Sequence, residues 1–432
     1  MTNHSVQHSQ HKKPKLIVYN KGKNIEESKK MSYSKLSKEL TSHIDKDEKK
    51  KNGIFFTPPK TIYENITYLK PYMKNIHTIL EPSCGSCEYI LKLKEMYSDM
   101  NITGIERNKT IYDSIKQYNS HNTTIIHDDY LSHTFDNTFD LIIGNPPYFV
   151  MKKSDVKECY YDYFDGRPNI FILFIIKSLR LLQSNGIMSF VLPKNFLNCL
   201  YYDKTRKHIF INYSIIDIIE CNDSYIDTQQ DTIILIIQNV KPVDNDAFNI
   251  HISDYTIFGT KENITMLKTL YKHSTTLFDL GFNVSVGNVV WNQCKSILTD
   301  NSKETRLIYS SDITNNTLSM KSYSNKAKKN YIKKEGNNIP LLVINRGYGM
   351  GAYDFNYCII NEHDNIYYLI ENHLICIKYC KSLSKKELIK KYKQIIHSFK
   401  NEKTKDFIRM YFGNNAINTT ELCKILPIYD YY

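Results

Sequence analysis

The chain of 432 residues lacks the two glycine-rich signatures by which nucleotide-binding proteins are most easily recognised. It has no GxGxxG, the fingerprint of dinucleotide-binding folds, and no GxxxxGK[ST], the P-loop that cradles the phosphates of ATP or GTP. Glycine is scarce altogether, with 15 residues in the whole chain. NAD and ATP are therefore not the ligands that this sequence favours.

Long apolar runs are absent as well. The N-terminal MTNHSVQHSQHKKPK has no apolar stretch of the kind found in signal peptides, and no run approaches the ~18 apolar residues of a membrane helix. Ten cysteines are scattered along the chain, as in a protein with reduced thiols. We therefore expect an intracellular protein without a membrane span, in the cytoplasm or nucleoid, or in the host cell if the source is viral.

Two cysteine groupings have spacings that can serve redox or metal chemistry, Cys84-Gly-Ser-Cys87 and the stretch from His373 to Cys380. Neither is accompanied by the second ligand pair of a zinc site. We interpret both as packing or loop positions and expect no metal.

Positive charge is concentrated at the N-terminus. The first 51 residues hold 13 lysines, no arginine and 6 acidic residues, which gives +7 of the chain's net +12. We interpret residues 1–50 as a disordered basic tail with a short helix around residues 31–44, and favour a solvated tail over a dedicated nucleic-acid arm. The rest of the chain is mildly basic, which permits nucleic acid as a partner without requiring it.

Short apolar runs alternate with helical stretches across residues 51–245. Such a rhythm predicts βαβ units and a mainly parallel sheet, hence an α/β, Rossmann-like fold. Helices are expected at 89–97, 111–118 and 170–182, and strands at 78–80, 102–105, 124–126, 139–143, 187–192, 215–220 and 232–238. Lys241–Asp246 breaks the rhythm, so residues 246–432 are predicted to form a second, α+β domain.

Polar side chains follow four successive predicted strands. Glu81 ends the first and leads into a turn containing Gly85, Glu106 ends the second, Asp129 follows the third and Asn145 the fourth. The carboxyl ends of parallel strands form one edge of a sheet, where ligands of open α/β sheets bind. A glycine turn there lets backbone approach a nucleoside, and an acid at the tip of the second strand can accept both ribose hydroxyls. This edge predicts a nucleoside cofactor.

The tetrapeptide Asn145-Pro-Pro-Tyr148, with the segments around it, is similar to the S-adenosylmethionine-dependent DNA N6-adenine methyltransferases. The order of motifs, with cofactor motifs first, catalysis next and target recognition last, resembles their γ group. Residues 55–59 resemble the leading cofactor motif, 81–86 the loop under the methionine part, and 166–171 and 186–196 the later core motifs. Standing alone, the tetrapeptide would fit a strand-terminating turn equally well.

The resemblance implies S-adenosylmethionine as cofactor. Glu106 matches the acid that binds the ribose, and Asp129 with Tyr130 matches the pair that holds the adenine. The predicted cofactor-binding residues are Thr57, Glu81, Ser83, Gly85, Glu106, Asp129, Tyr130 and Asn145. The chain departs from the family at Cys87, where a second glycine is usual.

The catalytic residues predicted are Asn145, Pro146 and Tyr148. The side-chain oxygen of Asn145 and the carbonyl of Pro146 would accept hydrogen bonds from the exocyclic amine of adenine and stabilise the positive charge that grows during methyl transfer. Tyr148 offers an aromatic face to the base, which must leave the duplex. Tyr225, at the family's position for a second aromatic, is expected to cover the other face.

The second domain is predicted to recognise a target sequence in double-stranded DNA. Trp291, Asn292, Lys295 and Arg346 have the chemistry for stacking, base-edge contacts and phosphate contacts. Each also has a structural interpretation, since the only tryptophan can be core and Asn345-Arg346-Gly347 can be a plain turn.

The function predicted is a site-specific DNA adenine methyltransferase, acting as a monomer, with any restriction endonuclease encoded separately. An enzyme of the same Asn-Pro-Pro-Tyr class that acts on RNA adenine or on a protein glutamine amide is the alternative. A non-catalytic protein that retains the fold is a third interpretation, against which the intact motif argues. The large C-terminal domain favours DNA.

Overall fold

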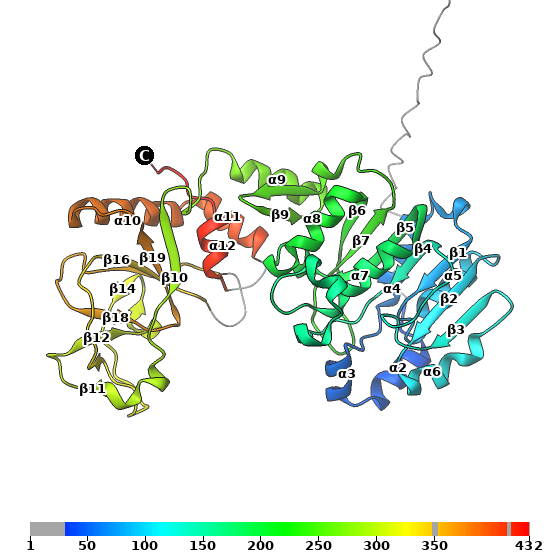
Figure 1. Ribbon diagram of the computed structural model, residues 1–432, viewed down its shortest axis with the longest axis horizontal. Helices are drawn as coiled ribbons and strands as arrows, with labels where there is room; N and C mark the ends of the chain where they lie inside the picture. The colour runs from blue at the N-terminus through cyan, green and yellow to red at the C-terminus, as the bar shows by residue number, and fades with distance from the viewer. Residues whose placement is uncertain (1–30, 348–352, 413–415, 432) are drawn as a thin grey trace, which may run out of the picture. The chain divides into compact units, whose positions relative to one another are not determined.

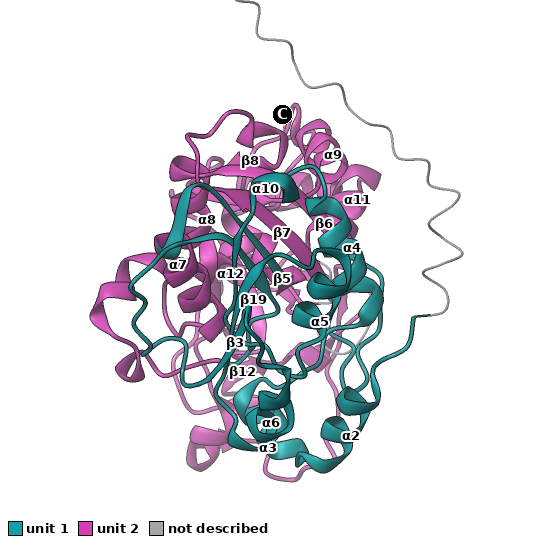
Figure 2. Ribbon diagram, turned by 90° about the vertical axis from the view of Figure 1, so that its right-hand side faces the viewer, with its two compact units in different colours: residues 1–149, 181–191, 221–232 teal, residues 150–180, 192–220, 233–432 magenta. Residues whose placement is uncertain are grey.

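The computed structural model describes residues 31–347, 353–412 and 416–431. Two compact units divide the chain (Figure 2). Unit 1 comprises residues 1–149, 181–191 and 221–232, and unit 2 comprises residues 150–180, 192–220 and 233–432. Within the described residues, no helix is long and apolar enough to cross a membrane.

The main sheet has seven strands in the order β3-β2-β1-β4-β5-β7-β6 (Figure 1). Parallel pairing joins β3 to β2, β2 to β1, β1 to β4 and β4 to β5. The order reverses between β2-β1 and β4-β5, which is the point of an open α/β sheet where ligands bind. The strands are β1 (Thr78–Glu81), β2 (Asn101–Glu106), β3 (Thr123–His127), β4 (Phe139–Gly144), β5 (Leu182–Pro193), β6 (Ser214–Cys221) and β7 (Thr232–Gln238).

All seven predicted strands are therefore present, and the α/β fold class is confirmed. The central strands are apolar runs buried on both faces, as parallel strands covered by helices must be. The helices that alternate with them are α4 (Pro59–Leu69), α5 (Glu88–Met96), α6 (Lys109–Ile115), α7 (Ile170–Leu181) and α8 (Asp203–Asn212).

The segment predicted as a disordered tail, residues 1–50, is folded from residue 31 onwards. Residues 31–52 contain α2 (Lys35–His43), which the short predicted helix anticipated, and α3 (Lys46–Asn52). Ser34 and Asp45 cap the two helices through side-chain bonds to backbone N–H groups, and Gly53 ends α3 with a φ of 65°. Residues 1–30 lie outside the described part of the chain.

Beyond residue 245, unit 2 mixes helices with small sheets, as expected for an α+β region. A four-stranded sheet has the order β10-β19-β16-β17 and a second has the order β11-β15-β12-β18. The helices are α9 (Lys261–Tyr271), α10 (Lys385–Phe399), α11 (Glu402–Tyr411) and α12 (Thr419–Lys424). The strands are β8 (Asn249–Ile252), β9 (Tyr255–Phe258), β10 (Phe282–Val286), β11 (Leu298–Thr299), β12 (Thr305–Ile308), β13 (Ile313–Thr314), β14 (Thr317–Leu318), β15 (Tyr331–Ile332), β16 (Leu341–Asn345), β17 (Tyr357–Ile360), β18 (Tyr368–Ile370) and β19 (Leu374–Tyr379).

The first of these sheets is apolar on both faces. Leu342, Ile344, Ile375 and Ile377 pack into the cluster that includes α10 and α11, whereas Val343 and Cys376 belong to a different buried cluster. The alternation follows from the period of two along a strand. The sheet is thus a central layer of the C-terminal region.

Candidate active site

Parallel pairing brings the predicted polar residues to one edge of the sheet in unit 1. Glu81 is in register with Gly104 on β2, and Glu106 with His127 on β3. Asn145 follows directly after β4, which pairs with β1. The four strand tips that the sequence singled out therefore lie on consecutive neighbouring strands.

Glu106 is buried, and both its carboxylate oxygens accept backbone hydrogen bonds. Oε2 accepts from the N–H of Gly85 at 3.0 Å and Oε1 from the N–H of Asn108 at 2.6 Å. Burial raises the pKa of Glu106 to about 7, although these N–H groups oppose the shift. A carboxylate has about four acceptor positions, so acceptor capacity remains for the hydroxyls of a ribose.

Glu81 is also buried, and its Oε2 has no hydrogen-bond partner among the described residues. Burial raises its pKa well above the ordinary value, and the neighbouring Cys87 and Glu106 raise it further. A buried acceptor without a donor is destabilising unless a ligand supplies one. The ammonium group of a methionine moiety is a donor of the right kind, so this residue fits S-adenosylmethionine.

The loop between Glu81 and α5 leaves room for close approach to backbone. Gly85 has a φ of 51°, in the left-handed region that glycine tolerates. Cys87, at the family's second glycine, adopts a φ of 64° without being glycine. A contact with Cys87, together with burial, raises the pKa of the Cys84 thiol well above its usual range. A thiol held neutral in this way is a poor redox nucleophile.

The remaining predicted cofactor residues differ in exposure. Oδ1 of Asp129 accepts from the N–H of Leu131 at 2.9 Å, and Oδ2 lies 3.5 Å from Nε of Arg107. Asp129 is partly exposed and available to a ligand, whereas Tyr130 and Thr57 are buried.

Three groups hold Asn145. Its Nδ2 donates to the carbonyl of Phe55 at 3.3 Å, and its backbone carbonyl accepts from the hydroxyl of Ser83 at 3.1 Å. Its Oδ1 accepts from the hydroxyl of Tyr148 at 2.5 Å, and that hydroxyl also lies 2.7 Å from the carbonyl of Val191. The amide is thus oriented with its nitrogen donating to Phe55 and its oxygen accepting from Tyr148, which leaves the second lone pair of the oxygen as an acceptor.

Two of these contacts could not be predicted from the sequence. The Phe55 and Val191 carbonyls are main-chain groups whose identity no residue pattern encodes. Gly53 was also missed: a Cβ there would lie 2.6 Å from the backbone nitrogen of Tyr148 and 3.0 Å from Cβ of Pro147. The Lys-rich run before Gly53 does not indicate that only glycine fits at this position.

Tyr148 and Tyr225 lie near each other. Burial raises the pKa of Tyr148 well above its ordinary value, and the proximity of Tyr225 adds to that shift. Tyr225 itself is 7% exposed, and burial raises its pKa as well. The two rings that the sequence assigned to the target base therefore belong to one neighbourhood.

The predicted DNA-contacting residues lie in unit 2. Asn292 and Lys295 are exposed, whereas Trp291 is half-buried against an apolar cluster, with Nζ of Lys295 5.6 Å from its ring centroid. Arg346 follows β16 and is half-buried, and its backbone carbonyl accepts from the N–H of Ile417.

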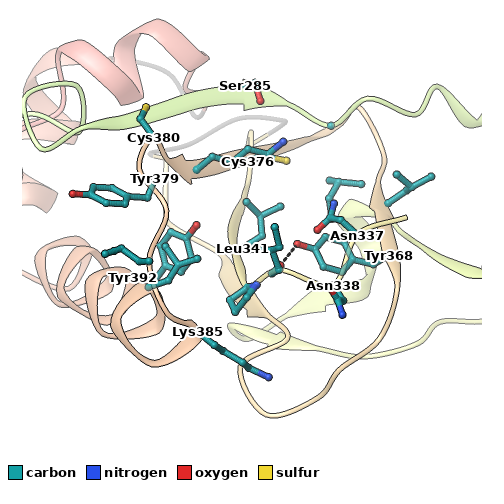
Figure 3. Close-up of a pocket in the computed structure, with 18 of the residues that line it drawn as sticks. Ser285, Asn337, Asn338, Leu341, Tyr368, Cys376, Tyr379, Cys380, Lys385 and Tyr392 are labelled. Carbon is teal, nitrogen blue, oxygen red and sulfur yellow. Dashed lines mark hydrogen bonds between the residues drawn. The ribbon is translucent and has the colours of Figure 1, made fainter. Parts of the chain in front are cut away.

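A cavity of about 820 Å³ is lined by residues of β10, β16, β18, β19 and α10 (Figure 3). Lys378, Lys381 and Lys385 line it, and none of its lining residues is acidic. A neighbouring cavity differs in this respect, because Glu304 and Glu335 accompany its lysines. Other polar residues line the lysine cavity as well, among them Asn337, Asn338 and Tyr379.

Comparison with known proteins bears on these features. A model of the Eco57I restriction-modification methylase family matches residues 52–226. The chain is 28% identical to the type II methyltransferase M.CvrRI of Paramecium bursaria Chlorella virus XZ-6E, over 91% of this chain and 98% of the relative. It is 30% identical to the modification methylase CviBIII of Paramecium bursaria Chlorella virus NC1A, over 48% of this chain and 55% of the relative.

One solved structure shares the fold over most of the chain. The DrdV–DNA complex matches 91% of this chain and 57% of its own, with a TM-score of 0.53 and 12% identity.

The sheet, its strand tips and these matches support S-adenosylmethionine as the cofactor. The resemblance to the type II restriction-modification methylases that the sequence predicts is confirmed by the similarity to this family model and to these relatives.

Proposed function

We propose that this protein methylates N6 of adenine at a specific sequence in double-stranded DNA. The observation that carries the proposal is the arrangement of Asn145, whose side-chain nitrogen is anchored on Phe55 and whose oxygen is left as an acceptor beside Tyr148. An amide fixed in this way is suited to an N–H donor. The exocyclic amine of adenine is such a donor.

The bound cofactor supplies the methyl group, and the chain's residues prepare the amine. The lone pair of that amine is delocalised into the ring, which makes it a weak nucleophile. Oδ1 of Asn145 and the carbonyl of Pro146 accept hydrogen bonds from the N–H groups of the amine. These bonds draw the nitrogen towards tetrahedral geometry. The same two acceptors stabilise the positive charge that develops, and they are fixed before the reaction.

Tyr148 contributes through its hydroxyl as well as its ring. A tyrosine hydroxyl has one proton, yet two acceptors lie within reach, Oδ1 of Asn145 and the carbonyl of Val191. When an amine approaches Asn145, the proton can turn to Val191, so that Tyr148 stays hydrogen-bonded while the lone pairs of the amide are released. The ring remains available for stacking against the base.

DNA is the substrate proposed for three reasons. The relatives are named as type II methyltransferases and a modification methylase, and a solved structure of similar fold is a DNA complex. The C-terminal region presents exposed Asn292 and Lys295. It also has the acid-free lysine cavity, whose cations suit phosphates. In this proposal the protein acts as a monomer, and any restriction endonuclease is encoded separately.

Expression in cells that lack adenine methylation tests the proposal. Single-molecule sequencing of their DNA should reveal N6-methyladenine at one short sequence, and Asn145→Ala should abolish the signal. Unmodified DNA from cells with soluble wild-type protein would refute it.

A further inference from the structure

The loop that carries Tyr225 joins β6 to β7 and has neither helix nor strand between Cys221 and Thr232. No backbone ladder fixes such a segment, so the position of a side chain within it depends on side-chain contacts. An aspartate stands two residues before Tyr225 and another two residues after it. Both are bound to lysines from the N-terminal part of unit 1.

The contact after Tyr225 joins Asp227 to Lys49 of α3. Nζ of Lys49 lies 2.7 Å from Oδ2 of Asp227 and donates to the carbonyl of Thr41 at 2.7 Å. The Lys49 side chain is 5% exposed, while its neighbour Lys50 is exposed. A buried ammonium group is rare in proteins and needs its partners. This ion pair is therefore a specific contact, unlike the solvated charges of the same helix.

The contact before Tyr225 joins Asp223 to the start of α4. Oδ1 of Asp223 accepts from Nζ of Lys60 at 3.1 Å, and Oδ2 accepts from the hydroxyl of Thr61 at 2.8 Å. Both oxygens of the carboxylate are thereby used by adjacent residues of one helix. The loop is held at two points that bracket the tyrosine.

We propose that Lys49 and Lys60 are positioning residues for the target base, which hold the Tyr225 loop through Asp227 and Asp223. This inference rests on the proposed function, because Tyr225 is taken as the ring that covers the flipped adenine. Extrusion of a base costs a few kcal/mol, and stacking returns about 1–3 kcal/mol per ring. If the Tyr225 loop were mobile, the stacking free energy would be lost, whereas the chemistry at Asn145 would be unaffected.

Helix α3, which carries Lys49, also contacts the proposed cofactor site through the neighbouring residue Glu48. Oε1 of Glu48 accepts from Nδ2 of Asn108 at 2.9 Å, and the backbone N–H of Asn108 is bound to Glu106. Adjacent residues of α3 thus touch the turn after the ribose acid and the target-base loop. The segment that the sequence suggested was a tail is a structural part of both sites.

The test uses full-length protein and duplexes that contain the mapped target, with the target adenine either paired or mismatched. Lys49→Met removes the charge and keeps most of the side-chain length, and Lys50→Met is the matched control on the same helix. We expect Lys49→Met to lower kcat/KM on the paired target by about 10- to 100-fold, and a mismatch, which makes extrusion easier, to restore most of it. Lys50→Met should match wild type, and cofactor affinity should be unchanged in both.

Asp227→Asn provides a second variant should Lys49→Met fold poorly, because Asp227 is 29% exposed and asparagine keeps its size and a side-chain oxygen that can still accept from Nζ of Lys49. It should show the same mismatch rescue, and the double variant should be no worse than either single one. Equal loss on paired and mismatched targets, or wild-type rates on both, would overturn the inference while leaving the proposed function standing. If wild-type protein methylates no adenine, the proposed function fails and takes this inference with it.

Discussion

The affinity for S-adenosylmethionine should depend on the ionisation of Glu106. Burial raises the pKa of this carboxyl to about 7, so it is largely protonated at pH 6 and largely ionised at pH 7.5. Only the ionised form offers all its oxygen lone pairs to ribose hydroxyls while keeping the two backbone bonds. Affinity should therefore rise as the pH rises through 7, the direction opposite to that of a group that binds when protonated.

The size of the change in affinity follows from the fraction of the protein in which Glu106 is ionised. With a pKa near 7, roughly 0.09 of the protein is ionised at Glu106 at pH 6 and roughly 0.76 at pH 7.5, which predicts about an eightfold gain in affinity. Calorimetry in buffers of different ionisation enthalpy should also show the release of about 0.9 proton per bound cofactor at pH 6.

Glu106→Gln is the decisive variant. It should bind more weakly and show no dependence on pH over this range. A slope that persists in Glu106→Gln would assign the titration to another group, such as Glu81, and refute the reasoning.

Three further outcomes are expected. Asn145→Ala should lower kcat by about 10²–10³ while DNA and cofactor affinities measured by titration stay near wild type, because the lost acceptor acts on the transition state. Three lysines line the acid-free cavity, Lys378, Lys381 and Lys385. Their replacement with glutamine should reduce the slope of log K for DNA against log[salt] by up to about 2.7 and leave sequence preference unchanged. An unaltered slope would show that the cavity is not part of the DNA-binding surface. A protein that begins at residue 31 should methylate DNA as wild type does, whereas one that begins at residue 53 should lose activity in the same assay. The reason is that α2 and α3 support both the proposed cofactor site and the Tyr225 loop. Equal activities of the two truncated proteins would contradict this role of α2 and α3.

The sheet could be predicted because its strands are short apolar runs with turn residues between them. Glu81, Glu106 and Asn145 could be placed together because parallel strands put their carboxyl ends on one edge. These inferences depend on spacing and side-chain type, both of which a single sequence contains.

The fold of residues 31–52 could not be predicted in this way. Its lysines look like solvated charge, and nothing in the local pattern separates Lys49, which is buried, from Lys50, which is exposed. The distinction is made by Asp227, which is distant in the chain. Likewise, the carbonyl of Phe55 that orients Asn145 is a main-chain group, so only the folded structure reveals it.

Analysis of the nucleosides from methylated duplex DNA tests the central claim most directly. Purified protein would be incubated with isotopically labelled S-adenosylmethionine and a duplex containing the mapped target, and the DNA would be digested and separated by liquid chromatography with mass spectrometry. The account predicts label in N6-methyldeoxyadenosine alone, and its loss with Asn145→Ala. Label in a methylated cytosine, or in RNA or protein but not in DNA, would contradict it.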